Sequence, residues 1–292
     1  MLPLESVPNF SEGRDAAVID SLVEAVERHA KVLDVHSDPD HNRSVITFVG
    51  EDEDVVDALV SVTAEASRLI DLRAHEGAHP RVGATDVAPV VPLRPEDMER
   101  AKAAAFAAAY RIADEVELPV FLYGELAPGR GPAFFRRGGI AELARRIEGG
   151  ELAPDFGPRA LDERAGCVLV GARRPLIAIN VDLAGADLET ARAIAACVRE
   201  TSGGFPGVRA LGLALPLSGR VQVSMNVEDW EAAAIGDIVA RIEDEAAAQG
   251  ATIAGSELVG LMPAGAAAAA AARILRIDGF DASRLLEVRL LG

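Results

Sequence analysis

The stretch that decides the fold is VLDVHSDPDHNRSVITFVG (residues 32–50). Two runs rich in β-branched residues, 32–35 and 44–50, flank a turn at Asp38-Pro39-Asp40. Such runs, bounded by turn residues, predict two paired strands. Helical periods, in which apolar residues recur at spacings of three and four, lie on both sides of this pair.

The same order of elements occurs twice along the chain. The first half predicts strand, helix, strand, strand, helix and strand at residues 4–8, 15–29, 32–35, 44–50, 53–70 and 87–93. The second half repeats this order at residues 176–181, 188–200, 208–215, 220–226, 237–249 and 252–261.

Two such units predict an α+β protein. We expect two similar βαββαβ subdomains, residues 1–174 and 175–292, each with a mostly antiparallel sheet and helices on one face. A cleft between two similar subdomains is a common place for a ligand, so we expect the ligand there. The connection over residues 125–174 is rich in Gly, Pro and Arg, and long irregular connections in compact chains are usually functional.

The chain is strongly acidic. Its 292 residues include 29 basic and 46 acidic side chains, for a formal net charge of −17, and half of them are hydrophobic. This composition indicates a globular protein and argues against general binding to nucleic acid or anionic membranes. It leaves room for a local basic pocket. Every cation except Lys31 and Lys102 is an arginine, which can hold a carboxylate in a bidentate fork.

Further classes are excluded by what is missing. Cys167 and Cys197 are too few for a disulfide framework or a thiolate metal site, and we expect both in the core of a protein from a reducing compartment. No secretory signal and no apolar run of about 18 residues is visible. We therefore expect a soluble, cytoplasmic protein.

The densest polar stretch is RAHEGAHPRVGATD (residues 73–86), which lies between an expected helix and an expected strand. Pro80 biases His79 away from helical geometry, and the glycines permit close approach of the backbone to a ligand. A metal site is one alternative, but the spacing is not that of a His-Glu-x-x-His helix, and no metal is predicted. General acid–base work by one histidine, with arginines holding carboxylates, fits better.

The remaining histidines have plainer explanations. His29 ends a helix, where it interacts favourably with the dipole. His36 and His41 flank the turn at residues 38–40, and they fit a solvated turn and a polar substrate pocket equally well. A second polar stretch, APDFGPRALDERAG (residues 153–166), predicts a rigid, cation-bearing loop without a P-loop or dinucleotide fingerprint. An ordinary connecting loop could have the same sequence pattern.

A resemblance to a known family covers nearly the whole chain. The motifs that carry it are VPNFSEG (residues 7–13), the Asn42-Arg43 turn, residues 75–89, PDFGP (154–158), GAR (171–173) and GSELVG (255–260). Together, and in this order, they resemble the formiminotransferase family, which comprises the glutamate formimidoyltransferases of histidine breakdown. The length implies a monofunctional form without a cyclodeaminase domain.

The resemblance implies a reaction and its residues. The formimidoyl group of N-formimidoyl-L-glutamate would pass to N5 of tetrahydrofolate, a co-substrate, giving 5-formimidoyltetrahydrofolate and L-glutamate. His79 corresponds to the family's catalytic histidine and would move the proton from N5 to the leaving amine. The folate-contacting loop of the family corresponds to Gly157, Pro158, Arg159, Ala160, Leu161, Asp162, Glu163, Arg164, Ala165 and Gly166.

Other side chains are candidate substrate contacts. Arg43 and Arg81, with Arg159 and Arg164 of the loop, are candidates to hold the carboxylates of glutamate and folate, and Asn42 lies beside Arg43 in the turn. His36 stands where the family pattern usually has an acid, so Asp38 or another group would have to serve in its place. The resemblance also implies a homodimer. Two alternatives stay open: formyl transfer involving 5-formyltetrahydrofolate, and a non-catalytic protein that binds folate or a small anion.

Overall fold

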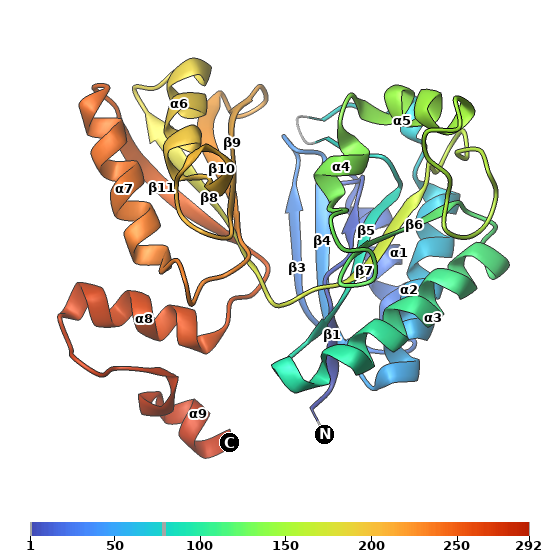
Figure 1. Cartoon of the computed structure of the whole chain (residues 1–292), viewed down its shortest axis with the longest axis horizontal. Coiled ribbons are helices and arrows are strands. Elements are labelled where there is room, and N and C mark those ends of the chain that lie inside the picture. Colours follow the sequence, from blue (N-terminus) through green and yellow to red (C-terminus); the bar gives the residue numbers. More distant parts are fainter. Residues whose placement is uncertain (1, 78–79, 292) are drawn as a thin grey trace. The chain divides into compact units, whose positions relative to one another are not determined.

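The computed structural model describes residues 2–77 and 80–291. The chain divides into two compact units, Met1–Arg174 and Pro175–Gly292 (Figure 1). Each unit has its own sheet and its own hydrophobic core. The predicted α+β class with mostly antiparallel sheets is confirmed.

The predicted strand pair at residues 32–50 is present. β3 (Lys31–Asp38) and β4 (Arg43–Gly50) are antiparallel, with Asp38 opposite Arg43 at the turn. Residues 44–48 of β4 are buried on both faces of the strand, with Val45, Ile46 and Phe48 in the core, and a slip of one residue would move these side chains to the wrong faces. The register sets which side chains meet at the turn.

The first unit extends the predicted pattern into a seven-stranded sheet. Its other elements are β1 (Leu4–Ser6), β2 (Asn9–Phe10), α1 (Ala16–Glu27), α2 (Asp52–Leu69), β5 (Thr85–Pro92), α3 (Met98–Glu115), β6 (Val120–Gly124), α4 (Pro132–Arg136), α5 (Gly139–Glu148) and β7 (Val168–Ala172). β1 and β2 each pair with both β4 and β5, while β7 runs parallel to β5 and β6. The repeated pattern did not include the parallel strands or α3.

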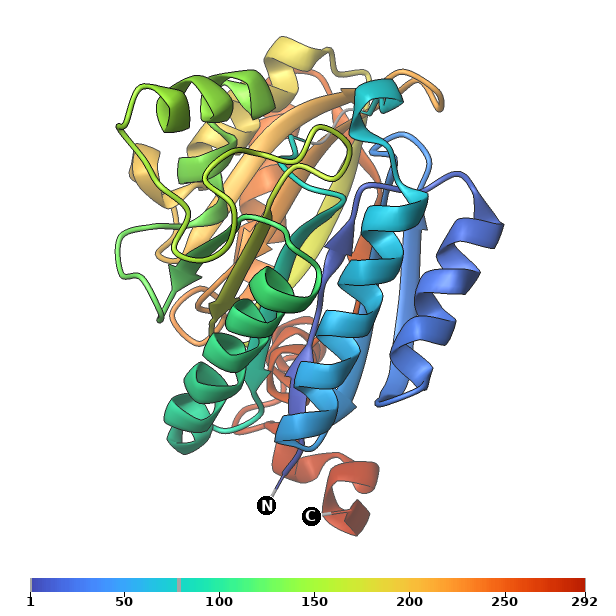
Figure 2. The ribbon, with the colours of Figure 1, turned by 90° about the vertical axis from the view of Figure 1, so that its right-hand side faces the viewer.

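Helices α1, α2 and α3 cover one face of this sheet (Figure 2). Asp15 caps the start of α1 by accepting hydrogen bonds from the N–H groups of Ala17 and Val18. The buried side of α3 consists almost wholly of alanines, which allow the helix to approach the sheet closely. An alanine-rich segment has a weak hydrophobic period, which explains why the pattern of larger apolar residues does not predict α3.

Helices α4 and α5 lie on the opposite face. Phe135 of α4 and Leu143 of α5 are fully buried in a separate cluster with Phe121 of β6 and Leu169 of β7. The ring centroids of Phe121 and Phe135 are 5.1 Å apart. The guanidinium of Arg146 lies 4.6 Å from the centre of the Phe134 ring, and its Nη1 donates to the Phe134 carbonyl at 2.9 Å. These contacts fasten α4 to the sheet.

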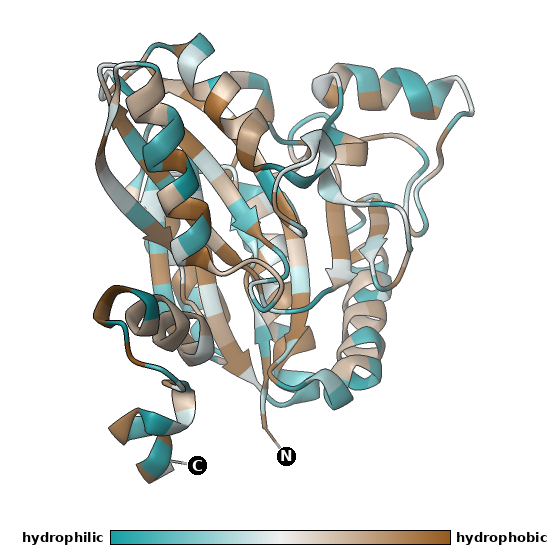
Figure 3. Cartoon of the chain, turned by 60° about the vertical axis from the view of Figure 1, so that its left-hand side comes forward, coloured by the Kyte–Doolittle hydropathy of each residue, from teal (hydrophilic) through white to brown (hydrophobic). Residues whose placement is uncertain are grey.

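The second unit has a four-stranded antiparallel sheet in the order β11-β8-β10-β9. Its elements are β8 (Ile177–Ala184), α6 (Leu188–Val198), β9 (Val208–Leu215), β10 (Arg220–Val227), α7 (Ile235–Ala248), β11 (Thr252–Val259), α8 (Ala264–Leu275) and α9 (Leu286–Leu291). Alternate residues of β8 and β10 pack beneath α6 and α7. Figure 3 shows the alternation of hydrophilic and hydrophobic residues along these helices. Among the described residues, no helix is both long enough and apolar enough to cross a membrane.

The aromatic anchor of α4 gives a first testable prediction. Replacing Phe135 by alanine removes a fully buried ring from between Phe121 and Phe134, so we expect the free energy of unfolding to fall by about 3–5 kcal/mol. Phe106→Ala is the matched control, because that ring is 49% exposed, and it should cost about 1 kcal/mol. Urea titration of both variants measures the difference, and equal losses would contradict the anchoring role.

Candidate active site

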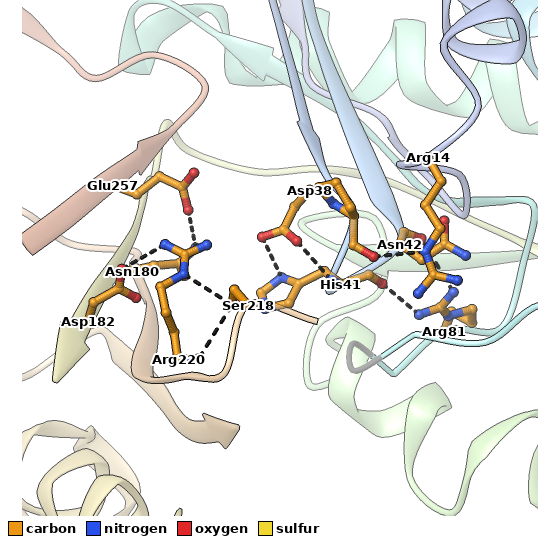
Figure 4. A network of polar contacts seen from close by, with 11 residues as sticks. Arg14, Asp38, His41, Asn42, Arg81, Asn180, Asp182, Ser218, Arg220 and Glu257 are labelled. Carbon is orange, nitrogen blue, oxygen red and sulfur yellow. Dashed lines mark hydrogen bonds and ion pairs between the residues drawn. The ribbon is translucent and has the colours of Figure 1, made fainter. Parts of the chain in front are cut away.

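The turn between β3 and β4 is a buried polar structure. The side chain of His41 is fully buried, and Asp38 and Asp40 are about 5% exposed. Oδ1 of Asp38 accepts a hydrogen bond from the backbone N–H of His41 at 2.9 Å, and Oδ2 lies 3.9 Å from Nδ1 of the same residue (Figure 4). The turn is therefore buried and not solvated, and the role of His41 in a substrate pocket stays a prediction.

Asn42 joins this turn to two other segments. Its Oδ1 accepts from the backbone N–H of Gly13 at 3.0 Å, and its Nδ2 donates to the Glu76 carbonyl at 2.9 Å. Its own carbonyl oxygen lies 3.1 Å from Nε2 of His75. The backbone of Asn42 has φ of 47°, in the left-handed region that asparagine tolerates better than most residues. The predicted contact residue is thus the point at which three segments meet.

Two glycines make this close meeting possible. A Cβ atom on Gly13 would clash with the carbonyl oxygen of Asp38 and the backbone of Arg43. One on Gly77 would clash with the carbonyl oxygen of His41. Backbone therefore packs directly on backbone on both sides of the turn.

Arg81 reaches the turn from the segment that follows Gly77. Its Nη2 donates to the His41 carbonyl at 3.0 Å, and its guanidinium lies against the His75 ring. Burial lowers the pKa of Arg81 to about 10. Burial, and secondly the charge of Arg81, lower the pKa of His75 below its ordinary value, so His75 is neutral at neutral pH.

An ion pair completes this group of charges. Asp86 of β5 is almost fully buried; its Oδ1 accepts from the Val82 backbone N–H at 2.7 Å, and its Oδ2 pairs with Arg136 of α4. Arg43 is close enough to both for its pKa to respond: burial, and then the charge of Arg136, lower that pKa to about 10. Arg43 and Arg81, predicted from sequence, are thus brought together, and Asp86 and Arg136 join them.

The predicted catalytic residue, His79, lies outside the described residues. Its neighbours in sequence, Gly77 and Arg81, both contact the turn at residues 38–43. The role of His79 therefore stays a prediction.

The loop of residues 157–166 is fastened to the same segment. The backbone N–H of Leu72 donates to the Arg164 carbonyl, and that of Ala84 donates to the Ala165 carbonyl, both at 2.8 Å. Gly166, with φ of 71°, pairs with Gly83 in an antiparallel bridge. The end of the loop thus contacts both ends of the stretch at residues 72–84.

Charges within the loop have specific positions. Oδ1 of Asp162 accepts from the backbone N–H groups of Arg164 and Ala165, so this acid closes a turn of the loop. Nη2 of Arg164 donates to the Arg68 carbonyl at 2.9 Å, and Arg159 is exposed. A cavity of about 510 Å³ lies beside the loop, and its polar lining includes Arg73, Glu117, Asp162, Glu163 and Arg164.

Two groups of polar residues were not predicted. The first is the Asp86–Arg136 pair; Asp86 stood in a quoted motif without a role, and the only signal for Arg136 was the arginine content of residues 125–174. The second lies on the second unit, on the face of its sheet away from the helices, where Asn180 donates to Glu257 and Arg220 pairs with Asp182 (Figure 4). Alternation of polar and apolar residues along β8 and β10 is the signal for this face.

No group of three or more His, Cys, Asp or Glu side chains suited to a metal ion occurs within residues 2–77 and 80–291. Cys167 is buried, and burial holds the pKa of its thiol well above the ordinary value, so it is not poised as a nucleophile.

The close contact at Gly166 gives a second prediction. Gly166 and Gly150 both have a positive φ, 71° and 74°, but an added Cβ would clash with the Val82 carbonyl oxygen only at Gly166 and would meet open space at Gly150. Gly150→Ala should cost about 1–2 kcal/mol for the backbone conformation alone. Gly166→Ala should cost about 1–3 kcal/mol more, measured by urea unfolding. Equal losses of unfolding free energy in the two variants would show that the loop moves to accommodate the added Cβ, and would contradict the prediction.

The environment of His75 gives a third testable prediction. Nuclear magnetic resonance titration should find its pKa below the ordinary value of about 6.5, and Arg81→Gln should raise that pKa by removing a neighbouring positive charge. In the unaltered protein, the unfolded chain binds a proton at His75 more readily than the folded chain does. The free energy of unfolding should therefore fall as the pH falls through about 6.5. If the pKa of His75 is the same in Arg81→Gln as in the unaltered protein, the proposed effect of Arg81 on His75 is wrong.

Comparisons with known proteins identify the family. Residues 3–173 match the family described as formiminotransferase domain, N-terminal subdomain, and residues 178–281 match the formiminotransferase domain. Glutamate formimidoyltransferase from Streptococcus pyogenes serotype M1 is 38% identical, with 99% of each chain covered, and that from Thermoplasma acidophilum is 38% identical over 98% of this chain and 97% of its own. Formimidoyltransferase-cyclodeaminase from Rattus norvegicus is 40% identical over 89% of this chain, which spans 50% of that protein. The chain belongs to the formiminotransferase family.

Proposed function

We propose that this protein transfers the formimidoyl group from N-formimidoyl-L-glutamate to N5 of tetrahydrofolate, releasing L-glutamate. The observation that carries the proposal is similarity over almost the full length to two proteins named glutamate formimidoyltransferase. The site on the first unit supports it, because buried arginines beside a histidine-bearing segment suit an anionic substrate that exchanges protons.

His79 is our candidate for the general acid–base. It would accept the proton that N5 loses and deliver it to the amine of the departing glutamate, a role suited to a side chain whose pKa lies near neutrality. His75 is a poorer candidate for this role, because its ring is held by Arg81 and the Asn42 carbonyl.

Residues 157–166 are our candidate for the folate contact. Their backbone is fixed at Gly166 and at the carbonyls of Arg164 and Ala165, which favours a preorganised binding surface. The exposed Arg159 could meet a glutamyl carboxylate, and the cavity beside the loop has the volume of an ordinary small-molecule site. When bound, tetrahydrofolate supplies the nucleophilic nitrogen; the chain's part is to position it and to move the proton.

We also propose that the protein works as a homodimer in the cytoplasm, on the strength of the family resemblance. Light scattering coupled to gel filtration tests the assembly, and a monomer mass at micromolar concentration would rule the dimer out. The predicted ligand cleft between the two units stays a prediction.

His79→Ala tests the reaction. The protein is incubated with N-formimidoyl-L-glutamate and tetrahydrofolate, and formation of 5-formimidoyltetrahydrofolate is followed. We expect the variant to lose turnover by about 100-fold or more, because proton transfer by a positioned side chain contributes about that factor. Its affinity for tetrahydrofolate should stay within about twofold of the unaltered protein.

His29→Ala is the matched control, since His29 lies exposed after the end of α1 and away from the site. It should retain full turnover. Absence of product from the unaltered protein, with folate binding confirmed, would refute the proposal in favour of a binding protein. Product formation only from 5-formyltetrahydrofolate and glutamate would favour the formyl-transfer alternative.

A further inference from the structure

Three arginines of the first unit, Arg43, Arg81 and Arg136, lie close to the buried carboxylate of Asp86. Burial lowers the pKa of both Arg43 and Arg81, and the charges of Arg136 and Asp86 act on both. The Asp86 carboxylate pairs directly with Arg136, and Arg43 lies near enough to both for their charges to act on it. A partly buried guanidinium is costly unless its N–H donors find acceptors.

Arg136 has hydrogen-bonding capacity to spare. One of its terminal nitrogens pairs with Asp86, and its side chain is 16% exposed. Its Nε is buried and has no hydrogen-bond partner in the part of the chain that the structure describes. A buried donor without a partner in a native structure calls for a ligand or a water.

The fold holds Arg136 in place. Phe135, the preceding residue, is packed in the cluster under α4, and Arg146 clamps Phe134 from α5. Asp86 is itself oriented by the Val82 backbone N–H. A side chain fixed at both ends in this way is preorganised for binding and loses little conformational entropy when a ligand arrives.

We infer that Arg136, with Arg43 and Arg81, forms the binding site for the α-carboxylate of the formimidoyl donor, and that Arg136 is a specificity-determining residue for that donor. This inference rests on the proposed function. Guanidinium groups bind carboxylates through paired, charge-assisted hydrogen bonds, and a carboxylate offers acceptor oxygens to the Nε of Arg136, which has no partner among the described residues.

The position of the cluster distinguishes the donor from folate. Arg81 follows His79 by two residues, so the cluster belongs to the segment that carries the proposed acid–base. In N-formimidoyl-L-glutamate the α-carboxylate is attached to the carbon bearing the reacting nitrogen. In tetrahydrofolate the aminobenzoyl group separates N5 from every glutamyl carboxylate. A carboxylate bound close to the chemistry is therefore that of the donor.

Steady-state kinetics of Arg136→Gln test the inference. We expect the KM for N-formimidoyl-L-glutamate to rise about 10- to 100-fold, the usual loss for a charged hydrogen bond, while the KM for tetrahydrofolate changes less than threefold. Arg136→Lys keeps the positive charge but not the paired donors of the guanidinium, so its KM for N-formimidoyl-L-glutamate should lie between those of the unaltered protein and Arg136→Gln. Arg137→Gln is the matched control, because Arg137 is the next residue and is exposed, and its kinetics should not change.

A shortened donor identifies the carboxylate. The N-formimidoyl derivative of 4-aminobutyrate lacks only the α-carboxylate, so the unaltered protein should use it at least about tenfold less efficiently than the full donor. In Arg136→Gln this discrimination should shrink to a few-fold. If Arg136→Gln instead loses its discrimination against a donor that lacks the side-chain carboxylate, the assignment to the α-carboxylate is wrong.

Stability is separated from binding by a double variant. Arg136→Gln leaves Asp86 buried without its partner, whereas adding Asp86→Asn removes that charge and keeps an oxygen for the Val82 N–H. The double variant should keep the raised KM while recovering thermal stability, and a normal KM would overturn the inference. If the unaltered protein shows no turnover, the proposed function fails, and calorimetric binding of L-glutamate against 4-aminobutyrate, with and without Arg136, still decides the role of the cluster.

Discussion

The site of the first unit depends on the side chain of one asparagine. Asn42 accepts a hydrogen bond from Gly13 and donates one to Glu76, and so it holds the loop before α1, the β3–β4 turn and the stretch after α2 together. Its left-handed backbone suits glycine or asparagine, but glycine has no side chain to make these bonds. Aspartate would present an acceptor to the Glu76 carbonyl where a donor is needed. The geometry therefore requires an amide of this length.

The charge arrangement follows from that backbone frame. With the turn fixed, Asp38 and Arg43 face each other across the end of the hairpin, and the carbonyl of His41 is available to Arg81. Burial makes these interactions strong, and it makes unpaired charge expensive, as the lowered pKa of Arg43 shows. Arginine suits such a site better than lysine, because a guanidinium is more weakly hydrated and carries five donors in a rigid plane. A chain of net charge −17 thus holds three arginines, Arg43, Arg81 and Arg136, close together in its first unit.

Local signals in the sequence predicted the hairpin, the repeated order of elements and the polar turn. Each depends on residues close in the chain: β-branched runs on either side of Asp38-Pro39-Asp40, and helical periods beyond them. The Asp86–Arg136 pair could not be predicted in this way, because its partners are 50 residues apart and meet only through the packing of α4. The parallel pairing of β7 with β5 and β6 is likewise a long-range choice that no local pattern specifies. The sequence placed Arg159 and Arg164 in a loop, but it could not predict where they lie in space. The contacts that fix a loop are made with residues distant in the sequence.

The two units have related strand orders but distribute their polar side chains differently, and the reason is physical. In the second unit one face of the sheet packs beneath α6 and α7, and the alternate residues of β8 and β10 include Asn180, Asp182 and Arg220. In the first unit α4 and α5 cover part of the second face with an aromatic and aliphatic cluster. The buried carboxylates of this unit lie at the hairpin turn and at the start of β5. Helix α4, which covers part of this second face, also carries the arginine that pairs with Asp86.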